Sequence, residues 1–210
     1  MNNSMVNTAR LLGAGLRALL VLTLVTGVIY PLVVTGVAQA FFPGKGNGSE
    51  VKYDGKVVGS SLIGQQDYSL DYFQPRPAGG LGDNTVNTQY KLILSGATNL
   101  SADNPGLIKA VEEAKAKVVK DNSTADYRVK PSQVPADAVT SSGSGLDPDI
   151  SPAYAELQVH RVAERNHLSV AQVETLVQSH VEGRTLGFVG EPRVNVLELN
   201  IALRELAKGH

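Results

Sequence analysis

One apolar stretch near the amino terminus constrains this chain more than any other feature. Residues 18–42 read ALLVLTLVTGVIYPLVVTGVAQAFF, 25 residues without a charged side chain. Because a helix rises about 1.5 Å per residue, this stretch could reach roughly 37 Å and cross a hydrocarbon core of about 30 Å with some tilt. The sequence therefore predicts a transmembrane helix over residues 18–42, with all later residues on one side of the membrane.

The charges around this stretch predict its orientation. Arg10 and Arg17 precede it, and the first acidic residue of the chain is Glu50. Basic residues stay in the cytoplasm. We therefore expect residues 1–17 to be cytoplasmic and the carboxyl-terminal part to be periplasmic or otherwise extracytoplasmic, on a single-pass protein of the cell inner (plasma) membrane.

A cleaved signal peptide is the alternative to a permanent anchor. The segment Ala38-Gln39-Ala40 has the small-x-small form that signal peptidase accepts. The apolar run, however, exceeds the roughly 7–15 residues of a signal-peptide core, which favours an uncleaved anchor. A hydrolase or binding protein secreted after cleavage at Ala40 remains the alternative function.

The predicted membrane helix carries one face with little side-chain bulk. Thr23, Gly27, Pro31 and Thr35 follow one another at intervals of four residues. Small residues let a second helix approach closely, which is how helices associate in lipid. This pattern predicts a docking face for a partner helix, although glycine and proline are also ordinary in membrane helices.

The exported part has the size and charge of one ordinary acidic domain. A glycine-rich linker at residues 43–49, in which no regular element is expected, leads to a domain over residues 50–210. All 20 acidic residues follow residue 49, so the exported part has a formal charge of about −3 and nothing indicates nucleic-acid binding. Because the chain has no cysteine, it can form neither a disulfide nor a thiolate metal site.

The pattern of this domain predicts an α+β fold, rich in helix with a small sheet. Short β-branched or apolar runs broken by glycine indicate strands within residues 51–58 and 61–63. Residues 65–89 are rich in Gly, Pro, Asn, Asp and Tyr without a sustained period, which predicts a long ordered loop. One helical turn is expected at residues 135–139.

Four helices are predicted from their capping residues. Each begins after an Asn or Ser side chain that can accept from the first turn, and two have proline at the first helical position. Their expected starts and ends are Asn104 to Asp121, Ser151 to Arg165, Ser169 to Gly183 and Asn195 to Gly209. The first helix carries a stripe at Leu107, Ile108, Val111, Ala114 and Val118, which we expect to face the core.

The residues give little support for catalysis. Ser142 and Ser144 lie in a stretch of serines and glycines that could form an anion-binding nest, a nucleophile site or simply a turn, but the G-x-S-x-G pattern is absent. The four histidines have no metal-ligand spacing, and the nearby aspartates lack the EF-hand pattern. Arg76 and Arg193 lie in proline-containing segments and predict ion pairs or carbonyl contacts within the domain.

Several segments together resemble the KdpC family, a subunit of the bacterial potassium-transporting P-type ATPase. They occur in the family's order over nearly the whole chain, with Ala97-Thr98 where the family more often has Gly-Ser and His160 where it often has proline. The segments are TGVIYPL (26–32), GSSLIGQ (59–65), YFQPRP (72–77), SGATNL (95–100), VTSSGSGLD (139–147), ISP (150–152), QVHRVA (158–163) and PRVNVLELN (192–200).

The resemblance implies an accessory, non-catalytic subunit in a high-affinity potassium uptake complex. Its partners would be a channel-like potassium-translocating subunit, a P-type ATP-hydrolysing subunit and a small single-span membrane peptide. The chain would need no cofactor of its own, since ATP, magnesium and potassium are handled by the complex. The family is described as supporting assembly and as a catalytic chaperone that raises the ATP affinity of the hydrolysing subunit.

The same resemblance suggests site residues. Gln158 matches a glutamine ascribed to nucleotide contact, although the predicted topology places it outside while ATP is cytoplasmic. Arg76, Ser142, Ser144, Asp147 and Arg193 are candidates for interactions of the domain.

Overall fold

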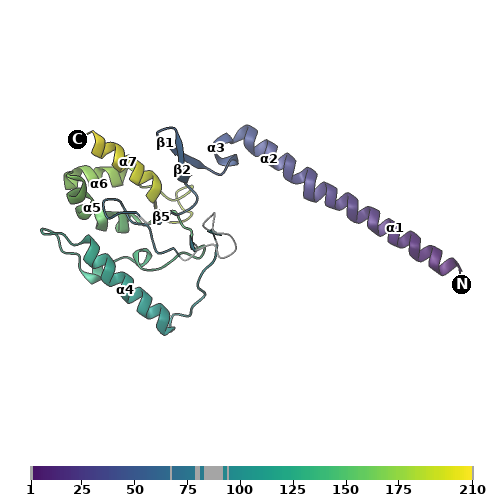
Figure 1. Ribbon diagram of the computed structural model, residues 1–210, viewed down its shortest axis with the longest axis horizontal. Helices are drawn as coiled ribbons and strands as arrows, with labels where there is room; N and C mark the ends of the chain where they lie inside the picture. The colour runs from purple at the N-terminus through teal and green to yellow at the C-terminus, as the bar shows by residue number, and fades with distance from the viewer. Residues whose placement is uncertain (1, 67, 79–80, 83–91, 94, 210) are drawn as a thin grey trace. The chain divides into compact units, whose positions relative to one another are not determined.

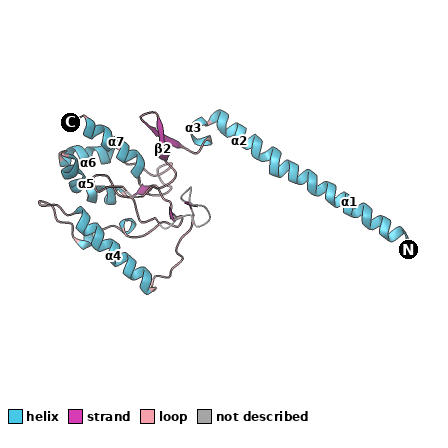
Figure 2. Ribbon diagram, in the orientation of Figure 1, coloured by secondary structure: helices cyan, strands magenta, loops and turns pink. Residues whose placement is uncertain are grey.

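The computed structural model describes residues 2–66, 68–78, 81–82, 92–93 and 95–209. It divides into two compact units, residues 1–50 and 51–210, which we describe separately. Figure 1 traces the chain from its amino-terminal helix to the carboxyl-terminal helix, and Figure 2 shows that helices dominate and that the strands are short. The α+β class predicted from the sequence is confirmed.

The first unit is a continuous helical run. It consists of α1 (Asn2–Leu24), a π-helical turn η1 (Val25–Ile29) and α2 (Tyr30–Phe41). Residues 4–41 form a helix of 38 residues that contains an 18-residue stretch with a mean hydropathy of 2.3 and no buried side chains, so the helix is long and apolar enough to cross a membrane. The helix begins earlier than predicted, because the polar residues before the apolar stretch are also helical.

The π-helical turn lies directly before Pro31. The Tyr30 N–H donates to the carbonyl of Val25, five residues back instead of four. Proline has no N–H and crowds the carbonyl four residues before it, here that of Gly27. A wider turn is a known way to accommodate such a defect. Together with this turn, the Thr26 hydroxyl donates to the Leu22 carbonyl at 2.7 Å.

The residues after the long helix form a short helix, so the expectation of an unstructured linker was wrong. Helix α3 (Pro43–Gly46) has proline at its start, and the Gly46 N–H donates to the Phe42 carbonyl at 2.6 Å. The Asn47 amide donates to the Pro43 carbonyl and accepts a hydrogen bond from Gln39. These side-chain hydrogen bonds satisfy polar groups of the segment that would otherwise be hydrogen bonded to water.

A hairpin of β1 (Glu50–Tyr53) and β2 (Lys56–Ser60) stands at the start of the second unit, and the first residue of β1 is the last residue of the first unit. Asp54 and Gly55 have φ values of 53° and 75°, the left-handed pair that a two-residue hairpin turn requires. The strand expected at residues 61–63 is absent, since this described segment forms turns and a bend. Two further antiparallel pairs join β3 (Leu81–Gly82) to β4 (Leu92–Ile93) and β5 (Asp149–Ile150) to β6 (Val194–Asn195).

The helices of this unit begin where their caps predicted. The structure has α4 (Pro105–Asn122), α5 (Pro152–Asn166), α6 (Val170–Ser179) and α7 (Val196–Lys208), with 3-10 turns η2 (Pro131–Gln133) and η3 (Ala136–Ala138). The side chains of Asn104, Ser151, Ser169 and Asn195 each accept a backbone N–H of the first turn. Helix α6 ends at Ser179, one turn before the predicted stop at Gly183.

The core forms where α5 packs against α4 and α6, and α6 against α7. Phe73 from the loop after the hairpin is fully buried with these helices. Only Val118 of the stripe predicted on α4 is buried, and Ile108 is 46% exposed. The expectation of a fully core-facing α4 was therefore wrong for its first half. The buried helix residues include Tyr154, Ala155, Val159, Val162, Ala163, Val173, Val177, Val196, Leu199 and Leu203.

Candidate functional site

Buried amide side chains hold the backbone of the loop that contains Phe73 and Gln74. The Phe73 N–H donates to Asn200 Oδ1 at 2.8 Å, and Asn200 Nδ2 donates back to the Phe73 carbonyl at 3.0 Å. Gln158 makes the same pair of bonds to Gln74, at 2.6 and 3.1 Å. Each side-chain amide thus pairs with both the backbone N–H and the carbonyl of one loop residue, as the backbone of a neighbouring strand does in a sheet. We call Gln158, Arg161 and Asn200 the amide clamp.

Arg161 completes the amide clamp from the same helix as Gln158. Its Nε donates to Asn122 Oδ1 at 2.8 Å, and its Nη2 donates to Gln158 Oε1 at 2.7 Å. Its Nη1 donates to the carbonyls of Leu70 and of Tyr72. Burial lowers the pKa of Arg161 to about 10, so the side chain remains a cation at neutral pH. Among the described residues, this buried charge contacts neutral oxygens and no carboxylate.

Gln158 therefore has a structural role in this fold. Its side chain has no exposed surface, and both polar atoms of its amide are hydrogen bonded within the domain. A nucleotide could reach it only if the loop of Gln74 moved away. The contact with nucleotide ascribed through the family stays a prediction, and this burial argues against it.

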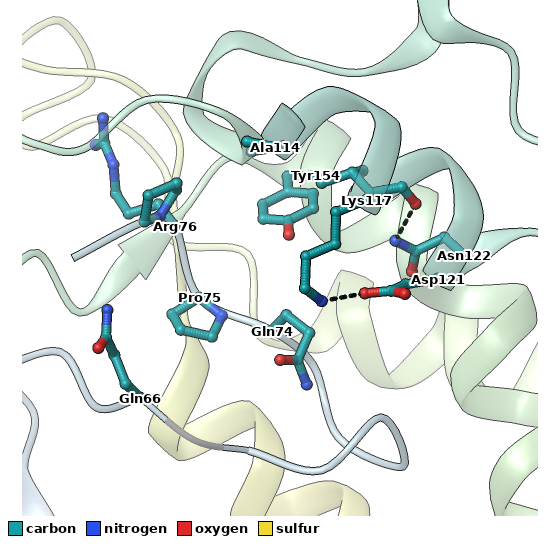
Figure 3. Close-up of a pocket in the computed structure, with 12 residues that line it drawn as sticks. Gln66, Gln74, Pro75, Arg76, Ala114, Lys117, Asp121, Asn122 and Tyr154 are labelled. Atoms are coloured by element: carbon teal, nitrogen blue, oxygen red, sulfur yellow. Dashed lines mark hydrogen bonds and ion pairs between the residues drawn. The ribbon is translucent and has the colours of Figure 1, made fainter. Parts of the chain in front are cut away.

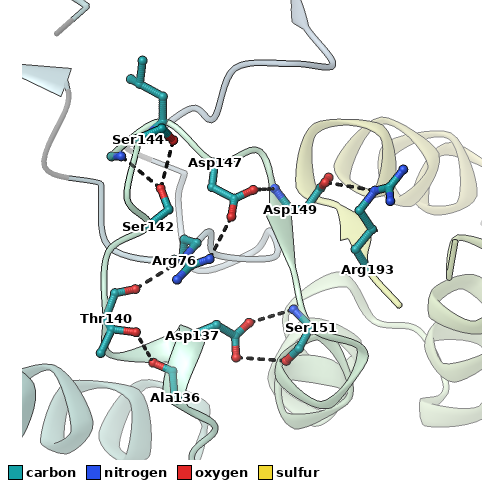
Figure 4. A network of polar contacts seen from close by, with 12 residues as sticks. Arg76, Ala136, Asp137, Thr140, Ser142, Ser144, Asp147, Asp149, Ser151 and Arg193 are labelled. Carbon is teal, nitrogen blue, oxygen red and sulfur yellow. Dashed lines mark hydrogen bonds and ion pairs between the residues drawn. The ribbon is translucent and has the colours of Figure 1, made fainter. Parts of the chain in front are cut away.

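A second network of charges lies beside the clamp and is drawn in Figure 4. Arg76 Nη1 contacts Asp147 Oδ2 at 2.7 Å, and its Nε donates to the Thr140 carbonyl at 3.3 Å. Asp137 accepts the Ser151 N–H at 2.7 Å and the Ser151 hydroxyl at 2.9 Å, which fixes the start of α5. Arg76 thereby ties the loop of the amide clamp to the segment that precedes α5.

Arg193 occupies the other end of this network. Its Nε lies 3.2 Å from Asp149 Oδ2, and its Nη2 lies 2.5 Å from Glu182 Oε2. Burial raises the pKa of Asp149, and the negative charge of Asp147 raises it further, whereas Arg193 lowers it. The ion pairs predicted for Arg76 and Arg193 from their positions in the sequence are confirmed.

Ser142 and Ser144 stabilise a turn. Their hydroxyl oxygens lie 3.1 Å apart, Ser142 Oγ accepts the Gly145 N–H at 3.0 Å, and Ser144 Oγ accepts the Leu146 N–H at 3.1 Å. The hydrogen bonds of these two hydroxyls, as the structure gives them, include no histidine or carboxylate that could act as a base. This geometry favours the turn over the nucleophile among the alternatives that the sequence left open.

A cavity of about 260 Å³ lies between α4 and the loop of residues 74–77. Figure 3 shows Lys117, Asp121 and Asn122 on the right and Arg76 on the left, with the Tyr154 ring between them and Gln74 below. Lys117 and Asp121 form an ion pair with each other. A larger hollow of about 660 Å³ continues along the exposed first half of α4 and shares Gln66, Pro77 and Ala114 with this cavity. The described residues that line this hollow are apolar or uncharged and include no acid–base pair.

No cluster of three or more His, Cys, Asp or Glu side chains that could hold a metal occurs in the described part of the chain. The His160 ring stacks on the Tyr127 ring with 3.8 Å between the ring centroids, and this packing explains the position of the histidine without a bound ligand. On the long amino-terminal helix, Gly27 lies in the π-helical turn, and a methyl group added there would lie 3.9 Å from Thr23 Cγ2. No side chain of the long helix is buried, so its predicted docking face is uncovered.

The structure brings together some of the predicted site residues and adds others. Arg76 joins Asp147, and Ser142 joins Ser144, whereas Gln158 lies in the amide clamp. Sequence reasoning missed Arg161 and Asn200. Their signal was position: both are polar residues within the apolar stripes of α5 and α7, where a buried polar group needs a partner.

The fold and the site define the class of this protein: a small α+β domain on an amino-terminal helix that is long and apolar enough to span a membrane. The family model "KdpC: K+-transporting ATPase, c chain" matches residues 12–205. The chain therefore belongs to the KdpC family.

Proteins named potassium-transporting ATPase KdpC subunit are similar to this chain over most of its length. The one from Streptomyces avermitilis is 71% identical over 98% of both chains, and the one from Streptomyces coelicolor is 66% identical over 98% of this chain and 97% of its own. The one from Mycobacterium tuberculosis is 46% identical over 91% of this chain and 96% of its own.

Proposed function

We propose that this chain is a non-catalytic accessory subunit of a high-affinity, ATP-driven potassium uptake complex. Its long helix would hold it among the membrane subunits, with the amino terminus in the cytoplasm and the domain outside. The partners would be the channel-like subunit, the ATP-hydrolysing subunit and the small membrane peptide. ATP, magnesium and potassium would be bound by these partners, and the chain itself would carry no cofactor.

The observation that carries the assembly role is the uncovered helix with a face of small residues. In a straight α-helix, residues at intervals of four drift around the axis by about 40° at each step. A π-helical turn has about 4.4 residues per turn, so each residue inside it rotates by only about 80°, and an interval of four that mixes α- and π-helical steps returns close to the same side. The turn at Val25–Ile29 thus brings Thr23, Gly27 and Pro31 closer to one line, a geometry that suits close helix packing.

Substitution of Gly27 tests this assembly role. Gly27→Leu should release the subunit from the complex, because the larger side chain prevents close approach of a second helix. Gly36→Leu is the matched control, since Gly36 belongs to the same helix, lies off the small face and likewise has free space around it. Equal co-purification of both variants with the partner subunits would contradict the docking face.

We further propose that the subunit acts as a catalytic chaperone at a distance. With the domain outside and ATP inside, an increase in ATP affinity must pass through the assembly as a coupling free energy, typically about 1–3 kcal/mol or 5–150-fold. The burial of Gln158 supports such indirect action over direct contact. The KM for ATP, measured with and without the subunit, should differ within this range. An unchanged KM would contradict the chaperone role.

A further inference from the structure

Tyr154 is almost completely buried, but its hydroxyl group opens into the cavity between α4 and the loop of residues 74–77. The residue is 3% exposed, and its hydroxyl has no hydrogen bond to any of the described residues. Every fully buried side-chain nitrogen or oxygen atom in the described part of the chain has a partner, so this hydroxyl is reached from the cavity that Tyr154 lines. Burial raises the pKa of Tyr154 to about 12, which keeps the hydroxyl protonated at neutral pH. It is therefore a donor that a ligand in the cavity can use.

Lys117 places a positive charge in the same cavity. Figure 3 shows the Tyr154 hydroxyl and the Lys117 side chain pointing toward the same part of it. The ion pair with Asp121 uses one of the three donors of the ammonium group, which leaves two for a ligand. Among the described residues that line the cavity, the charged side chains are Arg76, Lys117 and Asp121, an excess of one positive charge. Because charged acceptors form the strongest hydrogen bonds with such donors, this end suits a group with one negative charge, such as a carboxylate.

The hollow that continues from this cavity is apolar along α4. Leu107, Val111 and Ala114 were predicted to face the core, and they line this hollow of about 660 Å³ instead. Its volume falls within the roughly 300–1,000 Å³ of small-molecule sites, which are mostly apolar with a few polar groups that fix orientation. The described residues that line it carry no charge, so it suits the apolar part of a ligand. The cavity and the hollow share Ala114, and we call the two together the α4 pocket.

We propose that the α4 pocket binds a small amphipathic carboxylate, with the carboxylate group at Tyr154 and Lys117 and the apolar body in the hollow. A neutral apolar molecule would leave the Tyr154 hydroxyl without an acceptor, and a polyanion would place charge against apolar side chains. An amphipathic monoanion satisfies both ends. This inference concerns a binding site of the chain itself and does not depend on its proposed role in the complex.

Equilibrium dialysis of labelled octanoate against the full-length chain in nanodiscs of neutral lipid tests the proposal, with empty nanodiscs as the measure of partition into lipid. Tyr154→Phe keeps the ring and removes only the hydroxyl, so it should raise the Kd at least about tenfold through loss of a hydrogen bond to a charged group. Tyr127→Phe is the matched control, because this ring stacks on His160 outside the pocket, and it should leave the Kd unchanged. Octanoate binding equal to that of empty nanodiscs, or one Kd for the wild type and Tyr154→Phe, would overturn the inference.

A second variant tests the pocket without changing its polar end. Ala114→Leu fills the junction of the cavity and the hollow and should abolish saturable binding. Ala116→Leu, at an exposed position of the same helix outside the pocket, should bind as the wild type does. Urea unfolding checks that each variant is folded. An unchanged Kd in folded Ala114→Leu would contradict the assignment.

Two other probes identify the head group. Octanamide has the same shape without the charge and should bind at least about tenfold more weakly than octanoate, and equal affinity would refute the carboxylate. Dihexanoyl phosphatidylglycerol, added below its micelle concentration, should not displace octanoate. Displacement would assign the pocket to a lipid head group and overturn the inference.

Discussion

Replacement of Gln158 by alanine gives the clearest test of the amide clamp. The change removes the partners of the Gln74 N–H, the Gln74 carbonyl and one N–H of Arg161. Each buried polar group left without a partner costs about 1–3 kcal/mol. Because the Gln74 groups are only partly buried, the low end applies to them, and the total is about 3–5 kcal/mol. The whole free energy of unfolding of a folded domain is about 5–15 kcal/mol.

The assay is urea unfolding of the full-length chain in detergent, followed by the near-ultraviolet circular dichroism of its tyrosines. Gln178→Ala is the matched control, because this glutamine is exposed and its side chain donates to the Glu156 carboxylate at 2.9 Å on the surface. It should change the free energy of unfolding by less than about 0.5 kcal/mol. A Gln158→Ala variant with wild-type stability and a raised KM for ATP would refute the structural role and support direct contact with nucleotide.

Three further changes test other parts of the fold. Gly64→Ala places a methyl group 2.5 Å from the Asp147 carbonyl oxygen and should cost about 1–3 kcal/mol in urea unfolding, whereas Gly143→Ala, with free space around it, should cost far less. The pKa of Asp149 is raised in the folded state. Between the unfolded and the folded pKa values the folded state therefore binds more protons than the unfolded state, so the free energy of unfolding should fall as pH rises through this window. The fall should be smaller in Asp149→Asn, and identical pH profiles would contradict the assignment. Ser169→Ala removes the N-cap of α6 and should lower the free energy of unfolding by about 1 kcal/mol, and an unchanged urea midpoint would contradict this role.

Local signals in the sequence predicted most of the helices. The caps at Asn104, Ser151, Ser169 and Asn195 depend on one side chain and the first turn that follows it, so no distant contact is needed to find them. The end of α6 was predicted less well, because no glycine marks it: the helix ends at Ser179, and the His180 ring contacts the Leu176 carbonyl.

The hairpin turn was missed for a different reason. Asp54-Gly55 is a strong hairpin signal, but we predicted only short runs of strand broken by glycine within residues 51–58 and named no turn between them. The helix after Phe42 was missed because glycines predict irregular structure unless nearby side chains, here those of Gln39 and Asn47, supply hydrogen bonds.

The candidate site could be predicted only in part. The positions of Arg76 and Arg193 indicated ion pairs, and both form. Asp147 lies 71 residues from Arg76, and Asp149 lies 44 residues from Arg193, and no pattern in a single sequence specifies these two pairings. The amide clamp is less predictable still, because it joins Gln158 on α5 to a loop 84 residues earlier. The predicted loop over residues 65–89 lies partly outside the described residues.

The central claim is that this chain works as an accessory subunit of a potassium-transporting ATPase. The most direct measurement is potassium-stimulated ATP hydrolysis after purification from detergent-solubilised membranes through a tag placed after residue 210. The account predicts that this activity arrives together with larger membrane subunits and with the tagged chain at full mass. A lone, inactive chain of full mass, or a soluble chain that begins at Phe41, would contradict it.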